Sequence, residues 1–494
     1  IKPAKTEYSL KTNNLNASVN SQGTLFSKNG SHEPGLIFPK DSATSLIDAA
    51  NIVFFKKDSA GHFNAFPKTP EALTMTPGPI GTITNSELGY ISKVSLTNIL
   101  DHRSNYNLAN YVVPENILAW PVHIQALQSL GAPFEDFNNN QIYDPQNGDY
   151  PLILGDEAIY WINHPEDSSY KFEFHGILYA LNGPMNSLMN DVVFLRYKVI
   201  NKTQQSQDSM KLGFFVNSAI GNPFDDYSAS DSLNNIMYSF NGDNFDNTTG
   251  NIKGYGASSP ALGIKFLSDT MDSFVNNPSN TANNDYWVNG LKGLDYRGKA
   301  ILFPGSMDST KYMFAGDPIT NTGWTEQNSG YNPGNRSLLG SIPYFCMAPG
   351  DEKVIDLAIG IHSNQNNTGV AANNFFMLYT LNQMVAVYDS INYSSYDWGQ
   401  NNLCQLSTSI KKTKHSQKFK LYPNPAQNEI FIQAEKPIQQ IELFDIRGTL
   451  VLRKQIANKK RVQVSLKGNL SDGIYFVRVY TDGNIRNQKV VIQR

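Results

Sequence analysis

Cysteine, tryptophan and charged residues are scarce in this chain of 494 residues. Its two cysteines, Cys346 and Cys404, are too few for the disulfide framework of a small secreted domain, although they allow either one bridge or two buried thiols. The net charge of −3 gives no basic field for nucleic acid, and no apolar run approaches the roughly 20 residues of a membrane span. We therefore expect neither a nucleic-acid partner nor a transmembrane segment.

Signatures of catalysis are also missing. The sequence has no HExxH, GxSxG or CxxC motif, and a phosphate-loop pattern that starts at Gly293 fails at Ala300, where Ser or Thr is required. Of the eight histidines, His164 and His175 lie closest together, and we expect both to be ordinary structural or exposed histidines. A non-enzymatic protein is favoured, because nothing in the sequence supports an activity.

Turn-forming residues are abundant instead. With 36 Gly, 25 Pro and many Asn, the composition favours numerous turns and short strands over long helices. Alternating or continuous apolar patterns predict strands over residues 172–180, 192–199, 211–219 and 353–361, and apolar residues at helical spacing predict helices over 117–130 and 374–391. The expected fold class is mainly β: a β-sandwich-rich body with a few helices and long loops, and a small C-terminal Ig-like β-sandwich.

Charge divides the chain into an acidic body and a basic tail. Residues 411–494 hold 17 of the 40 Lys and Arg but 6 of the 43 Asp and Glu. The change falls in a polar stretch without apolar periodicity, which is typical of a linker. We therefore expect an N-terminal β-rich region over 1–180, a β-sandwich body over 181–406, a linker over 407–418 and a C-terminal domain over 419–494.

The tail resembles a known export signal. Short apolar segments separated by turns such as Asp472-Gly473 predict about seven short strands. The strings FKLYPNPAQNEIFIQ, IQQIELFDIRGTLV and LSDGIYFVRVYTDGNIRNQKVVIQ closely resemble the type A C-terminal sorting domain of proteins exported by the type IX secretion system of Bacteroidota. The resemblance implies that the outer-membrane machinery of this system binds residues 419–494, and that the protein is extracellular or lies on the outer cell surface.

One loop has the pattern of a calcium site. Oxygen-bearing side chains stand at alternate positions, with a backbone carbonyl at the seventh position, which is how a short loop wraps Ca²⁺. Gln141 replaces the glycine of an EF-hand loop and Asn147 its final glutamate, so the pattern is incomplete. The alternative is an Asn- and Asp-rich turn held by its own hydrogen bonds. We expect structural Ca²⁺ here, with the ligands Asp136, Asn138, Asn140, Ile142 (through its carbonyl), Asp144 and Asp149.

A second acidic cluster contains Asp225, Asp226, Asp231, Asp243 and Asp246. Adjacent carboxylates repel unless a positive charge lies between them, so a second cation is one interpretation. Solvated loop carboxylates are another. A third is the acid and nucleophile of a glycosidase, which depends on a carboxylate separation that sequence does not provide.

The body also resembles large, mostly uncharacterised secreted Bacteroidota proteins that carry the same sorting domain. The resemblance lies in Trp120-Pro121, the block around residues 131–151, and Trp161, and it implies no activity. We expect a secreted or cell-surface, non-enzymatic protein whose Ca²⁺-stabilised β body acts in adhesion or extracellular assembly, by self-assembly or by binding surface glycan. The alternatives are a secreted hydrolase acting on glycans, or a carbohydrate-binding protein using Trp287, Trp324 or Trp398.

Overall fold

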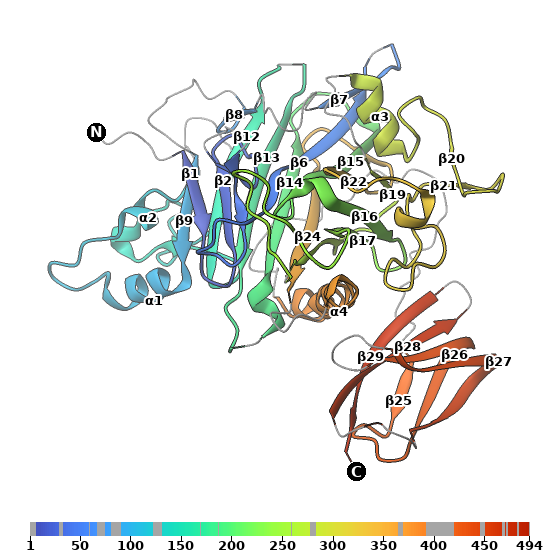
Figure 1. Cartoon of the computed structure of the whole chain (residues 1–494). Helices are drawn as coiled ribbons and strands as arrows, with labels where there is room; N and C mark the ends of the chain where they lie inside the picture. Colours follow the sequence, from blue (N-terminus) through green and yellow to red (C-terminus); the bar gives the residue numbers. More distant parts are fainter. Residues whose placement is uncertain are drawn as a thin grey trace.

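Two facing β-sheets form the body of the protein (Figure 1). The structure is a computed structural model that describes residues 6–28, 33–58, 60–66, 75–80, 90–121, 131–167, 169–185, 187–257, 259–276, 283–363, 369–391, 419–444, 450–466, 470, 473–481 and 484–493. Within this part of the chain, strands far outnumber helices, which confirms the expected mainly β class.

The first sheet has nine strands. Its order is β1 (Glu7–Leu10), β2 (Asn16–Asn20), β5 (Leu36–Ile37), β6 (Ser45–Lys57), β15 (Gln207–Ser218), β22 (Arg336–Ser341) and β19 (Ser273–Asn276), with β7 (Phe63–Phe66) paired to β6 and β23 (Phe345–Met347) paired to β15.

The second sheet also has nine strands. Its order is β16 (Asp226–Asp231), β17 (Ile236–Asn241), β18 (Ala261–Phe266), β24 (Glu352–His362), β14 (Val192–Asn201), β13 (Phe172–Ala180), β12 (Glu157–Pro165) and β8 (Met75–Pro77), with β9 (Ile91–Ser95) paired to β12. Three two-stranded ladders lie outside both sheets: β3 (Ser27–Lys28) with β4 (Glu33–Pro34), β10 (Phe134–Glu135) with β11 (Tyr150–Pro151), and β20 (Ile301–Leu302) with β21 (Ser309–Thr310).

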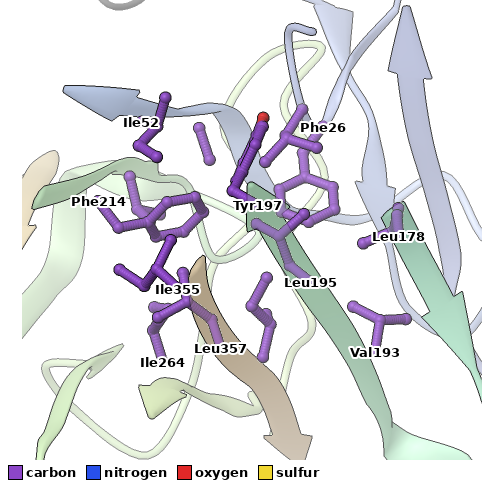
Figure 2. Packing of buried hydrophobic residues seen from close by; sticks show 14 of the residues in the cluster. Phe26, Ile52, Leu178, Val193, Leu195, Tyr197, Phe214, Ile264, Ile355 and Leu357 are labelled. Carbon is purple, nitrogen blue, oxygen red and sulfur yellow. The ribbon is translucent and has the colours of Figure 1, made fainter. Parts of the chain in front are cut away.

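The largest core lies between the two sheets. Side chains of the first sheet, such as Ile52 and Phe214, pack against Leu195 and Leu357 of the second (Figure 2). Burying such side chains removes apolar surface from water, which is the main favourable contribution to folding. The interior between the sheets therefore holds the body together.

Helices cover the outer faces of the sheets. The helices are α1 (Leu96–Asn105), α2 (Glu115–Leu118), α3 (Asn284–Lys292) and α4 (Gly369–Ser390), with short 3-10 turns η1 (Pro145–Asn147), η2 (Leu188–Asp191), η3 (Pro223–Asp225) and η4 (Gln327–Ser329). Trp287 of α3 packs on Phe215 of the first sheet, and Leu381 of α4 packs on the second. None of the described helices is both long and apolar enough to cross a membrane.

Strand β14 shows how this layering changes the burial expected from its sequence. Its alternating pattern predicts one buried face and one open face, but all ten residues are buried. Val193 and Leu195 face the core between the sheets, whereas Val192 and Phe194 lie in a second apolar cluster that includes Leu381 of α4. The expectation of an open face is wrong, because the second apolar cluster, to which α4 contributes, packs on it.

The other expected elements agree in part with the structure. The strand over 172–180 has these bounds in the structure, and the helix over 374–391 is α4, which begins five residues earlier at Gly369. Of the helix expected over 117–130, only the end of α2 is helical, and residues 122–130 lie outside the described part of the chain. Helices α1 and α3 were not expected, because both are short and polar in sequence.

Residue 180 is not a boundary between two sheet systems. Strand β6 pairs with β15 in the first sheet, and β13 pairs with β14 in the second, so both sheets join strands from either side of this position. The structure thus differs from the expected division into 1–180 and 181–406, because long-range strand pairing merges these segments into one two-sheet unit. The linker expected over 407–418 lies outside the described residues.

The C-terminal domain is a separate five-stranded unit with its own core, and it fits a small sandwich. Its strands are β25 (Lys420–Tyr422), β26 (Glu429–Phe444), β27 (Leu450–Ser465), β28 (Gly473–Thr481) and β29 (Asn484–Ile492). Fewer and longer strands form than the seven short ones expected. In β26, residues 430–432 and 438–444, which the sequence predicts as two separate segments, belong to one strand, since the chain passes Pro437 with a shift in register rather than a break.

This domain packs against α4 of the body (Figure 1). The ring of Phe375 in α4 lies 5.3 Å from that of Phe444 and 5.2 Å from that of Phe476, measured between centroids. Beside these rings, Arg478 places Nη1 3.1 Å from Oδ2 of Asp317 in the body. An aromatic cluster and an ion pair thus join the tail to the body.

Candidate functional site

The predicted calcium loop lies between β10 and β11, which pair to bring its ends together. Helix α1 lies beside it: Nε2 of His102 is 3.0 Å from the carbonyl oxygen of Asp149, and the ring of Tyr106 contacts that of Phe137. Figure 1 shows α1 and α2 beside β9, on the side of the body away from α3. We call residues 96–118 together with 131–151 the α1–α2 lobe.

The first half of the loop turns its side-chain oxygens inward. The amide N–H of Asn140 donates to Oδ1 of Asp136 and to Oδ1 of Asn138, both at 3.0 Å. Gln141 N–H donates to Oδ2 of Asp136 at 2.7 Å, and Ile142 N–H donates to Oδ1 of Asn140 at 2.7 Å. These oxygens therefore converge on the interior of one tight loop.

Asp144 is the acceptor at the centre of the loop. The side-chain amides of Asn147, Asn140 and Asn138 donate to its carboxylate at 2.7, 3.0 and 3.0 Å. These hydrogen bonds stabilise the charged form, with that from Asn147 the largest contribution, and they lower the pKa of Asp144.

Asp149 closes the loop from the buried side. Its carboxylate accepts hydrogen bonds from the N–H groups of Phe137 and Asp144, both at 2.9 Å. Burial raises the pKa of Asp149, against the effect of these two donors. Asp149 therefore ties both ends of the loop to one carboxylate.

The backbone forms the sharp turn of a calcium loop even though Gln141 replaces the usual glycine. Gln141, at the position where an EF-hand loop has glycine, adopts a left-handed conformation with φ of 63°. The donor set of carboxylates and amides suits a hard cation, and five of the six predicted ligands, Ile142 being the exception, have side-chain oxygens in these loop contacts. Among the described residues, no three His, Cys, Asp or Glu side chains form a ready-made metal group. The Ca²⁺ site stays a prediction.

The second acidic cluster divides into parts. Asp226 and Asp246 are buried, whereas Asp231 caps a turn by accepting Asn234 N–H at 3.1 Å. Burial raises the pKa of Asp246 to about 6 and that of Asp226 well above its usual range. Buried carboxylates of this kind are poorly placed to act on a polymeric glycan.

Sequence reasoning missed a buried polar triad in the second sheet. Nε2 of His175 lies 2.8 Å from Oε1 of Glu173, and its Nδ1 lies 2.6 Å from the hydroxyl of Tyr160. All three side chains are buried, so His175 is a satisfied structural histidine, as expected. The only sequence signal was a pair of polar residues within an apolar strand.

Residues named for other roles are also placed. Trp287 is buried in the core, which makes it unavailable for stacking on a sugar, and Trp324 is half-buried against Phe314. Cys346 is buried in β23. Cys404 and Trp398 lie outside the described residues, so their predicted roles are untested.

Two solved structures show a weak likeness to the chain. A polysaccharide lyase is 8% identical with a TM-score of 0.23, covering 67% of this chain and 35% of its own. A candidate aldose 1-epimerase from Escherichia coli K12 is 9% identical with a TM-score of 0.28, covering 73% of this chain and 99% of its own. This chain thus spans about a third of the lyase, and scores this low support no inference about fold or activity. A search of curated proteins returns no match.

The tail has a specific match. Residues 420–493 match the family model of the secretion system C-terminal sorting domain. The matched range begins with β25 and ends just after β29, so it coincides with the separate C-terminal domain. Such a tail directs its protein through the type IX machinery to the extracellular space or the cell surface. The chain is therefore a cargo protein of the type IX secretion system and carries a C-terminal sorting domain, which implies an origin in Bacteroidota.

Proposed function

We propose that this exported protein acts without catalysis, in adhesion or extracellular assembly, and that Ca²⁺ shapes its α1–α2 lobe. The observation that carries the proposal is the loop of residues 136–149. There, Asp136, Asn138, Asn140 and Asp144 direct oxygens into one turn, while Asp149 joins its ends. One bound cation could coordinate several of these oxygens at once, in place of the N–H groups of the loop that now donate to them.

The surface of the same lobe supports a role in contact with other molecules. Exposed large apolar side chains gather along this segment of the chain. They are Leu96, Leu100, Leu108, Val112, Leu118, Phe137 and Ile142. Exposed apolar side chains that accumulate in one region are typical of an interaction surface. A cation that stiffens the loop would hold Phe137 and Ile142 in a defined arrangement for such a contact.

Ion pairs between charged side chains of the sheets and carboxylates of neighbouring loops support a scaffold rather than a hydrolase. Arg336 pairs with Glu326 at 2.8 Å, and Lys353 pairs with Asp269 at 2.8 Å. Such pairs occupy these charges in structural contacts. The alternative of a glycan hydrolase would require accessible carboxylates, and glycan-hydrolysis assays test it directly.

The first experiment tests Ca²⁺ in the loop. Unfolding of the full chain is compared with Ca²⁺ and with chelator, for the wild type and for Asp136→Asn combined with Asp144→Asn. At a free Ca²⁺ concentration a hundredfold above Kd, a site adds roughly 2.7 kcal/mol to the free energy of unfolding. We expect the double variant to lose this contribution from the loop.

Local measurements make the comparison specific. Hydrogen exchange at the amides of Asn140, Gln141 and Ile142 should respond to Ca²⁺ in the wild type and not in the double variant. Asp308→Asn, which changes an exposed aspartate far from the loop in sequence, is the control and should respond as the wild type does. An unchanged exchange pattern in the wild type would instead identify the loop as a hydrogen-bonded turn.

A second experiment tests the contact surface. The triple variant Leu100→Ser, Leu108→Ser and Val112→Ser changes three exposed residues and should leave the thermal unfolding temperature nearly unchanged. We expect it to reduce self-association in sedimentation velocity, or attachment to bacterial cells, at least tenfold. Met307→Ser, at an exposed apolar residue outside the lobe, is the control. Equal behaviour of wild type, triple variant and control would reject the lobe as the contact surface.

A further inference from the structure

The chain crosses from the first sheet to the second between β15 and β16. This crossover, residues 219–225, is tied to the start of β6: Ala219 N–H donates to the carbonyl of Leu46 and Gly221 N–H to that of Ser45, both at 2.9 Å. Strand β16 then forms the edge of the second sheet. The crossover is therefore a direct covalent link between the two layers of the body.

Two buried carboxylates hold this crossover. Asp226 accepts the N–H of Ile220 through Oδ2 at 3.1 Å. Asp246 accepts the N–H of Asn222 through Oδ1 at 3.1 Å. Gly221 lies between these donors, and a Cβ atom there would stand 1.9 Å from Oδ2 of Asp246, so only glycine permits this approach.

Three buried oxygens beside the crossover have no hydrogen-bond donor. They are Oδ1 of Asp225, Oδ1 of Asp226 and Oδ1 of Asn241. Asn241 and Asp226 are direct partners in the β16–β17 pairing, so their side chains stand next to each other on one face of the sheet. Both residues are fully buried. A buried acceptor without a donor is costly, and two of them on directly paired residues point to a missing positive group.

The orientation of Asn241 is set by its neighbour. Its Nδ2 donates to the carbonyl of Asp243 at 2.9 Å and to Oδ1 of Asp243 at 3.2 Å. Because both of these partners are acceptors, the amide nitrogen must point toward them. The amide oxygen is the atom left for a different partner.

Protein cations do not supply this partner in the described structure. Asp225, Asp226, Asp243 and Asp246 repel one another electrostatically, and none of the ion pairs among the described residues includes any of them. Arg336, whose charge reaches Asp226, pairs with Glu326 instead. When ionised, these carboxylates therefore lack a compensating positive charge among the described residues.

We propose that Asp225, Asp226 and Asn241 form a second, buried site for Ca²⁺ that clamps the crossover to β16 and β17. Two carboxylates and one amide give an all-oxygen donor set, which suits a hard divalent cation rather than a transition metal. Ca²⁺ takes about six to eight oxygen ligands, and main-chain carbonyls or water would supply the remaining ones. The site shares no residue with the loop of residues 136–149.

The test starts from the chain in which the loop site is removed by Asp136→Asn and Asp144→Asn. In this background we expect Ca²⁺ to raise the unfolding temperature by roughly 5 °C over the value in chelator, and equilibrium dialysis to detect one bound ion. Adding Asp226→Asn should abolish both effects. Because Asn at 226 offers an N–H donor to Asn241 and removes one negative charge, this variant should be at least as stable as its parent in chelator.

The matched control is Asp231→Asn in the same background. Asp231 lies at the other end of β16, where it caps a turn, so the Ca²⁺ response should persist. Absence of any Ca²⁺ response in the loop-deleted parent would overturn the proposal and identify Asp226 as a protonated acid that donates to Asn241. A response that survives Asp226→Asn would overturn it as well. Neither result depends on whether the loop itself binds Ca²⁺.

Discussion

Replacing Arg478 by alanine is expected to detach the sorting domain from the body. Arg478 is buried at the contact, with Nη1 3.1 Å from Asp317 and 4.0 Å from Oε2 of Glu442. Its guanidinium group also lies over the rings of Phe375 and Phe444, at 5.4 and 4.9 Å from their centroids. Removing one partner of a fully buried pair costs about 3–5 kcal/mol, and the loss here is smaller because Asp317 is partly exposed. The variant also loses the contacts of the guanidinium group with both rings.

Small-angle scattering and hydrogen exchange provide the measurement. We expect Arg478→Ala to increase the radius of gyration and to increase exchange in α4 around Phe375, Phe376 and Tyr379. Arg453→Ala is the matched control, because Arg453 also pairs with Glu442, at 2.7 Å, but from an exposed position and within the sorting domain itself. If both variants keep the wild-type radius and exchange pattern, the ion pair does not hold the domains together.

The outcome bears on export. The sorting domain is the part of the cargo directed to the secretion machinery, and its Phe444 and Phe476 are buried against α4. A docked tail therefore hides part of its own surface, and detachment would expose it.

Stability between pH 8 and pH 10.5 is expected to depend on Lys211. This lysine is fully buried, and its Nζ lies 2.6 Å from Oδ2 of Asp272 and 2.8 Å from the hydroxyl of Ser341. Burial lowers the pKa of Lys211 to about 8, against the attraction of Asp272. The folded protein thus releases the Lys211 proton near pH 8, whereas the unfolded chain keeps it until about pH 10.5.

The sign of the effect follows from proton binding. Because the unfolded state binds more protons in this window, the free energy of unfolding rises with pH, by about 3 kcal/mol in total for this one group. Tyr312, whose pKa burial raises to about 12, acts in the opposite direction near the upper end of the window. The contribution of Lys211 must therefore be measured by comparing the pH dependence of the free energy of unfolding between the wild type and a Lys211 variant. The pH dependence of the wild type alone does not give it.

Denaturant unfolding of wild type and Lys211→Met across this range measures the difference. Met fills a similar volume, and Asp272 keeps Lys311, whose Nζ lies 3.0 Å away. We expect the difference in the free energy of unfolding, variant minus wild type, to be about 3 kcal/mol larger at pH 8 than at pH 10.5. Lys311→Met removes a half-exposed partner of the same Asp272 and should leave the wild-type slope nearly intact. Parallel curves for all three proteins would show that Lys211 does not titrate in this window.

Local signals in the sequence were sufficient for several elements. Apolar runs placed β13 and α4 nearly at their observed positions, and the strings from Phe419 to Gln493 identified the sorting domain that the family model matches. The Asp136 loop folds as one tight turn whose side chains hydrogen-bond within it, while Ca²⁺ binding there stays a prediction. Each of these features depends on residues close together in the chain, whose spacing alone sets which side chains meet.

Other features were decided only by tertiary structure. Segments on both sides of position 180 form one unit because β6 pairs with β15. The paired residues Phe54 and Leu212 are about 160 positions apart, and no local pattern encodes such a pairing. The burial of Asp226 and of the outer face of β14 depends on elements that pack from elsewhere, as does the contact of Arg478 with Asp317. The sequence by itself determined the export route and the β class, because repeating local patterns specify strands and signals. The layers, the buried charges and the docking of the tail arise from long-range contacts, and only the folded chain brings those residues together.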